Sequence, residues 1–224
     1  MANLSWLVKL IVTEGIALAR EAFGARRAKA PHDLDIVSAG IAMSSGAAAS
    51  REGKLAKGLG IMKAEQDAKE AEIRQRIVDF AIAEVGETFP DKYWRVVLPG
   101  DPGPYPKSWC GAGYLWCLHQ AGVTDAKWRR GTGIEGAFRM ANIPVEYTRE
   151  PLPGDMAYFD KNQHHAVVIA PTGGMVGLVN FNGDGGKVTR NHKTQRAVKL
   201  FYSIASLVRQ AATAELAAEK ASVA

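Results

Sequence analysis

The chain has 224 residues, of which 47% are apolar and 8% aromatic, as in a globular protein with one core of about 130 to 150 residues and an accessory segment. Its net charge of +5 suits anionic partners such as cell-wall polymer, nucleic acid or a membrane surface, and selects none of them. Two cysteines are too few for a disulfide-stabilised secreted scaffold.

The first 62 residues are predicted to form an arm outside the folded domain. Residues 4–23 carry apolar side chains at helical spacing, which predicts an amphipathic helix for docking or self-association. Residues 28–60 are rich in Ala, Gly and Ser, and they are interpreted as a linker or as an arm ordered by a partner. Lys9 and Glu14 interrupt the apolar run at the N-terminus, so we expect neither a secretory signal nor a transmembrane helix there.

The folded domain is predicted to span residues 63–202. A helix over residues 63–85 opens it, because Ile73, Ile77 and Phe80 lie on one stripe and a glycine follows. The segment 89–108 is rich in proline, glycine and aromatic residues, which is typical of a loop that lines a groove or packs on the core.

A short helix is predicted over residues 108–120, with Cys110 in its first turn. Pro104 and Pro106 prevent an earlier start, and Gly122 provides a C-terminal stop. Unpaired backbone N–H groups and the positive end of the dipole at a helix N-terminus favour a thiolate, which is the nucleophilic form of cysteine.

The same helix distinguishes the two cysteines. Cys117 lies seven residues after Cys110, so their Cα atoms are about 10 Å apart, too far for a disulfide. Cys117 is therefore predicted to be a buried, small apolar residue. His119 lies on the opposite face from Cys110 and is excluded as its partner.

Residues 131–136 spell the GxGxxG pattern of dinucleotide-binding loops. They follow the basic segment 127–130 and not a buried strand, so the β-α-β context is missing. We interpret the pattern as chance and expect no cofactor.

The region after residue 151 has β-strand patterns. Strands are predicted at residues 156–159, 165–170, 175–181 and 198–202, with turns between them. Helices followed by an antiparallel sheet indicate the α+β class. Residues 203–224 are predicted to form a separate Ala-rich C-terminal helix outside the sheet.

A cysteine nucleophile needs a base within hydrogen-bonding reach. His32 lies in the predicted linker and His192 follows a Gly-rich turn, whereas His164 and His165 open a strand. Neighbouring strand residues point to opposite faces, so only one of this pair can meet Cys110. No paired-ligand spacing is present, and no metal site is expected.

Three blocks of sequence together resemble the CHAP domain, the cysteine- and histidine-dependent amidohydrolase/peptidase family of the NlpC-type, papain-like clan. The resemblance covers about residues 73–202. The blocks are Trp109-Cys110-Gly111-Ala112 with Trp116-Cys117-Leu118 and Ala121-Gly122, then Pro153-Gly154-Asp155-Met156-Ala157-Tyr158-Phe159, then His165-Ala166-Val167-Val168-Ile169.

The resemblance implies a papain-like fold, in which a Cys-bearing helix packs on an antiparallel sheet, and it implies roles for individual residues. Cys110 is the expected nucleophile and His165 the expected base. In the family a third polar residue comes from the next strand; Asn182 is the first choice here, with Asn180 and Asp184 as alternatives. The oxyanion would be bound by the backbone N–H of Cys110 and a second donor.

The resemblance also implies hydrolysis of an amide bond in peptidoglycan, by a bacteriophage lysin that is free or carried in the virion. Such a protein would be located in the virion, or in the host cytoplasm before release to the cell wall. Besides peptidoglycan, virion proteins or a second copy would be its partners through the N-terminal helix, and no nucleic acid is expected. The alternative is a virion structural or assembly protein that keeps the fold without the activity.

Overall fold

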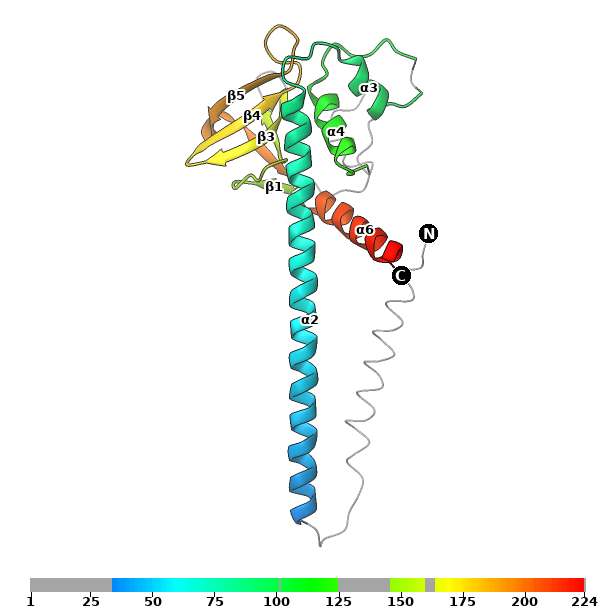
Figure 1. Cartoon of the computed structure of the whole chain (residues 1–224). Helices are drawn as coiled ribbons and strands as arrows, with labels where there is room; N and C mark the ends of the chain where they lie inside the picture. The colour runs from blue at the N-terminus through cyan, green and yellow to red at the C-terminus, as the bar shows by residue number, and fades with distance from the viewer. Residues whose placement is uncertain (1–33, 101, 125–145, 160–163, 224) are drawn as a thin grey trace. The chain divides into compact units, whose positions relative to one another are not determined.

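The structure is a computed structural model that describes residues 34–100, 102–124, 146–159 and 164–223, with side chains from residue 57 onward (Figure 1). The chain divides into two units between Gly58 and Leu59. The helix expected at residues 4–23 and the GxGxxG segment at 131–136 lie outside the described residues.

Helix α2 runs from Leu34 to Ala83 without interruption. The sequence predicted a linker or an arm ordered by a partner at residues 28–60 and a helix from residue 63. The helix instead begins at Leu34, so the prediction of a flexible linker is wrong and the arm is the remaining alternative, and residues 28–33 lie outside the described residues. Alanine is the strongest helix former, and a run rich in alanine outweighs the cost of about 1 kcal/mol for each glycine within the helix. The C-terminal half of α2 carries the predicted stripe, since Ile73, Ile77 and Ala81 are fully buried.

The segment expected to be a loop at residues 89–108 contains helix α3, Asp91–Val97. Pro90 occupies its N-cap, where the missing proline N–H leaves no hydrogen bond unmade, and Asp91 places a negative charge in the first turn. Tyr93, Trp94 and Val97 are buried, so α3 attaches the segment to the core.

Six antiparallel strands form one sheet in the order β1-β6-β2-β3-β4-β5 (Figure 1). Their bounds are β1 Glu146–Thr148, β2 Met156–Phe159, β3 His164–Thr172, β4 Met175–Asn180, β5 Thr189–Thr194 and β6 Leu200–Ser203. The α+β prediction is confirmed, and four predicted strands correspond to β2, β3, β4 and β6. Strands β1 and β5 were not predicted, because β1 has three residues and β5 contains no apolar side chain.

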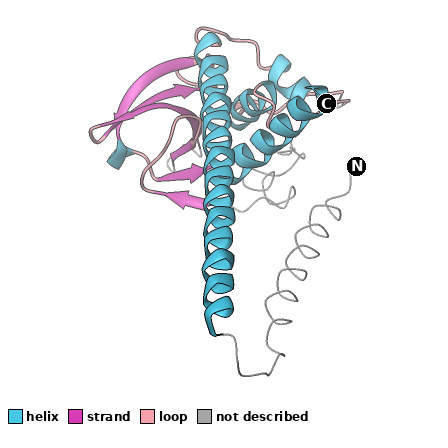
Figure 2. Cartoon of the chain, turned by 60° about the horizontal axis from the view of Figure 1, so that its bottom comes forward, coloured by secondary structure: helices cyan, strands magenta, loops and turns pink. Residues whose placement is uncertain are grey.

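The sheet separates two apolar clusters, and side chains alternate between them along each strand. We call the side of Val167, Val179 and Tyr202 the helix face, because these residues share the main core with helices α2, α3, α4 (Cys110–Gln120) and α6 (Ala205–Val223). The other side, the outer face, has a smaller cluster: Ala157, Ala166, Val168, Val176, Leu178, Val198 and Phe201. Figure 2 shows the strands on one side of the C-terminal part of α2 and helices α3, α4 and α6 on its opposite side.

Asp155 connects the sheet to the helices. It is 1% exposed, and its Oδ1 lies 2.9 Å from an Arg74 guanidinium nitrogen of α2. It also accepts hydrogen bonds from the backbone N–H groups of Leu152 and Ile204. A carboxylate buried with this many partners fixes three separate segments at one point. The Pro153-Gly154-Asp155 block is therefore a structural connection between the sheet and helix α2.

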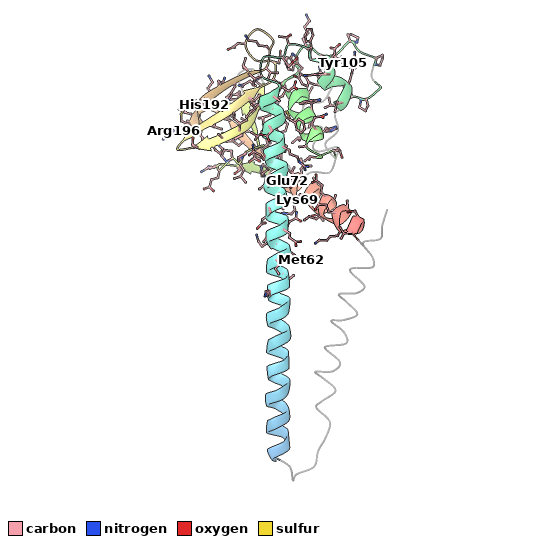
Figure 3. The ribbon with its side chains drawn as sticks, in the orientation of Figure 1. Met62, Lys69, Glu72, Tyr105, His192 and Arg196 are labelled. Atoms are coloured by element: carbon pink, nitrogen blue, oxygen red, sulfur yellow. The ribbon has the colours of Figure 1, made fainter. Side chains whose placement is uncertain are left out.

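The C-terminal helix predicted outside the sheet is present as α6, which belongs to the same unit as the sheet and packs along α2. Ion pairs join the two helices, including Lys69–Glu219 at 2.8 Å and Arg76–Glu215 at 2.5 Å. Lys69 is labelled on α2 in Figure 3. Among the described residues, no helix combines the length and the apolar composition that crossing a membrane requires.

Candidate active site

Cys110 is the first residue of helix α4, as predicted. Trp109 is the N-cap, and its carbonyl accepts the N–H of Gly113, which closes the first turn. The N–H groups of a first turn have no acceptor within their own helix, and they favour a negative charge placed beside them. The Cys110 side chain is 5% exposed, so this favourable position is shielded from bulk water.

A glycine allows α4 to approach the sheet closely. A Cβ atom on Gly113 would lie 2.1 Å from the ring of Phe181, which follows strand β4 and is fully buried. No side chain larger than hydrogen fits at this contact without displacing the ring. Gly113 therefore helps to set the distance between the cysteine helix and the sheet.

His165 faces Cys110 from strand β3. Its Nδ1 lies 3.6 Å from the Cys110 Sγ, although the two residues are 55 positions apart in the sequence. The alternation of strand side chains sends His165 to the helix face, next to Val167 of the main core. Tyr158, its direct neighbour on β2, packs against the imidazole with ring centroids 5.2 Å apart.

The environment of His165 keeps its imidazole neutral. Burial, with a smaller contribution from the neighbouring His164, lowers its pKa to about 4. A buried imidazole without a negative partner loses the hydration that stabilises its cationic form. At neutral pH the Nδ1 facing the thiol can therefore be an unprotonated acceptor.

The third residue of the expected triad is not in place. Within the described residues, none of the three candidates, Asn180, Asn182 and Asp184, has a hydrogen bond with His165. Asn182 donates instead to the Lys107 carbonyl at 3.4 Å. It also adopts a φ of 57°, in the left-handed region where asparagine is tolerated.

The β-sheet register explains why His165 has no polar partner on β4. Asn180 is paired with Ala166, so the next residue, Phe181, is at the level of His165, and its ring belongs to the main core. The structure brings Cys110 and His165 together. The orientation of the His165 ring is set by its packing against the Tyr158 ring and not by a polar partner.

His164 points to the outer face and meets a different partner. Its Nε2 lies 3.2 Å from Oδ1 of Asn180. Burial lowers the pKa of His164, while the hydrogen bond that its Nε2–H donates to Asn180 and the nearby charge of Asp184 act in the opposite direction. The two adjacent histidines are therefore separated by the sheet, as strand alternation requires.

Cys117 is a free thiol in the interior of α4, as is Cys110 at its start. It is fully buried, and burial raises its pKa well above the usual value for a thiol. Its environment therefore disfavours the thiolate, so Cys117 is a core residue.

A cavity of about 910 Å³ opens beside Cys110 and extends over the outer face. Ser108 and Cys110 contribute to its lining from the helix side, and His164 and Asn180 from the sheet. The turn at residues 182–185 also lines the cavity, as do Phe159 and Lys199. Strand β5 and the 3-10 helix η2 (Gln195–Ala197) contribute a further wall, where polar and basic side chains predominate. Sequence reasoning missed this wall because β5 lacks apolar alternation, although Asn191 and Lys193 have the i, i+2 spacing of one strand face.

In the described part of the chain, no group of three or more His, Cys, Asp or Glu side chains is arranged to hold a metal ion. Comparison of the chain with models of known protein families, with curated proteins and with solved structures found no match.

Proposed function

We propose that the protein is a cysteine hydrolase that cleaves an amide bond of bacterial peptidoglycan, with Cys110 as nucleophile and His165 as base. The observation that carries this proposal is the 3.6 Å contact between the Cys110 Sγ and the His165 Nδ1 at the start of helix α4. A thiol beside a neutral imidazole, at a helix N-terminus and next to a cavity, meets the geometric requirements of nucleophilic catalysis.

The first half of the reaction forms a thioester. His165 Nδ1 accepts the thiol proton, and the Cys110 sulfur attacks the carbonyl carbon of the amide. The backbone N–H of Cys110, with a second donor, would bind the resulting oxyanion. When the tetrahedral intermediate collapses, the C–N bond breaks and the imidazolium gives its proton to the departing amine.

The second half of the reaction regenerates the enzyme. His165, neutral again, takes a proton from a water molecule as the oxygen attacks the thioester carbonyl. The C–S bond breaks, and the proton on the imidazole returns to the sulfur. The products are a carboxylic acid and an amine, so no redox step or cofactor is involved.

The choice of peptidoglycan as the substrate rests on the resemblance to the CHAP family described above. The bond cut would be the amide that joins sugar to peptide, or an amide within the stem or cross-bridge peptide. The volume of the cavity, about 910 Å³, is sufficient for a peptide segment of several residues.

Digestion of purified peptidoglycan by the full-length protein tests this function. We expect turbidity to fall and new amino groups to appear without new reducing sugar ends, because an amide and not a glycosidic bond is cut. Cys110→Ala should abolish amine release, and Cys117→Ala should retain it. EDTA should leave the rate unchanged. Equal behaviour of the wild type and Cys110→Ala would contradict the proposal and favour a structural role in a virion.

A further inference from the structure

The cavity beside Cys110 has a charged end that the reaction does not use. Lys193 of β5 and Arg196 of η2 line this end, Lys199 lines the cavity beside β2, where its backbone N–H donates to the Tyr158 carbonyl, and Asp184 is the only acidic side chain among the described lining residues. Lys193 and Arg196 are exposed, and neither forms an ion pair with another described residue. Figure 3 labels Arg196 beside the sheet. This end of the cavity therefore carries a net positive charge available to a ligand.

The middle of the cavity offers one unused hydrogen-bond donor and one unused acceptor. Asn180 is 6% exposed, and its Oδ1 is engaged by His164, which leaves its Nδ2 without a partner among the described residues. The Oδ1 of Asn191 is buried and likewise without a described partner. Both residues line the cavity. A buried polar atom without a partner is costly, and these two atoms together complement the C=O and N–H of a peptide group.

We propose that this cavity binds a peptide segment bearing a free carboxylate, with the carboxylate at Lys193 and Arg196 and a peptide group at Asn180 and Asn191. This inference rests on the proposed function for the orientation of the ligand, since the bond to be cut must lie at Cys110. The enzyme would then select amides that carry a negative charge further along the peptide. Lys193 and Arg196 would determine specificity without touching the reacting atoms.

The order of the lining residues supports this assignment. Cys110 and Ser108 lie at the helix side, the asparagines belong to β4 and β5, and Arg196 follows β5. A chain extending from the thiol across the sheet would meet the amide side chains first and the cations last. A guanidinium also suits the planar, two-oxygen geometry of a carboxylate.

A binding experiment that needs no catalysis tests the carboxylate site. The probe is a soluble stem-peptide fraction from digested cell wall, compared with the same fraction after its carboxylates have been converted to amides. The protein is the full chain with Cys110→Ala, which prevents turnover. We expect the native fraction to bind about tenfold more tightly than the amidated one, because amidation removes the ion pairs of its carboxylate with Lys193 and Arg196.

The variant Lys193→Gln/Arg196→Gln, in the same background, should lose this tenfold preference. Lys187→Gln/Arg190→Gln is the matched control, since both residues are exposed, lie outside the described lining and carry the same charge. The control should keep the preference. A preference that survives Lys193→Gln/Arg196→Gln, one that the control loses equally, or no binding of either fraction would overturn the inference.

Rates of hydrolysis of native and amidated cell wall can contradict this inference and the proposed function independently of each other. If wild-type protein digests native and amidated wall with the same kcat/KM, the carboxylate site is contradicted while the hydrolase proposal stands. If wild-type protein digests neither, but Cys110→Ala binds the native fraction through Lys193 and Arg196, the hydrolase proposal falls and the binding site stands. The expected result is a KM about tenfold higher for amidated wall with little change in kcat.

Discussion

Two adjacent histidines have different partners on the two faces of the sheet. On the helix face, His165 lies against Cys110 and the Tyr158 ring. On the outer face, His164 lies against the amide of Asn180 and lines the cavity. Burial lowers the pKa of both imidazoles, and the two residues differ in their partners. The face of the strand therefore decides which histidine has access to the thiol.

The two faces also differ in the size of their apolar clusters and in their polarity. The helix face belongs to a large core held by four helices, and Asp155 fixes the junction between α2 and the strands. The outer face has a smaller apolar cluster and a polar cavity. We infer that the helix face holds the reacting pair in position and that the outer face binds the ligand.

The largest expected effect is the difference in hydrolysis rate between the His165→Ala and His164→Ala variants. His165→Ala removes the base and should lower amide hydrolysis of purified peptidoglycan about a thousandfold or more. His164→Ala removes a contact to Asn180 on the other face and should leave the rate within about threefold of wild type. Initial rates of amine release measure both. The reverse pattern would mean that the reacting histidine lies on the outer face.

The next effect concerns the stability of the helix face. Asp155→Ala leaves the buried Arg74 guanidinium without its carboxylate, which should lower the free energy of unfolding by about 3–5 kcal/mol. Asp67→Ala is the control, since the ion pair of Asp67 with Lys63 is exposed and should cost about 0.5 kcal/mol or less. Urea denaturation measures both. Equal, small losses would show that Asp155 does not hold the junction.

A smaller effect is expected from acidification. The imidazole of His165 takes up its proton with a pKa of about 4 in the folded protein, against about 6.5 when unfolded. Between these values the unfolded chain binds more protons, so stability is complete above pH 6.5 and falls as the pH is lowered toward 4, by at most about 3 kcal/mol. His165→Ala should flatten this part of the stability profile.

Local patterns predicted the helix that carries Cys110 and limited its partner to two adjacent histidines, and the resemblance to the CHAP family selected His165. The prolines and glycine around residues 108–120 predicted the helix with Cys110 in its first turn, and strand alternation predicted that one of two adjacent histidines would face it. Both inferences depend on geometry within a few residues. Local rules of this kind hold when the surrounding fold does not override them.

Long-range pairing was not predictable in the same way. The position opposite His165 is held by Phe181 because of the β3–β4 register, and nothing near Asn182 in the sequence reveals that register. Strand β5 has no apolar residue, so its wall of the cavity could be recognised only after it paired with β4. Helix α2 extends back to Leu34 because the segment is rich in alanine, a strong helix former. The sequence prediction gave more weight to the glycine and serine of the same segment.

The most direct test of the central claim is the rate at which iodoacetamide labels the two cysteines at neutral pH, followed by mass spectrometry of each peptide. Cys110 lies beside the His165 imidazole and lines the cavity, whereas Cys117 is fully buried. The account predicts that Cys110 is labelled at least about tenfold faster than Cys117, and that His165→Ala slows Cys110 alone. Equal labelling of the two thiols, or a Cys110 rate unaffected by His165→Ala, would contradict it.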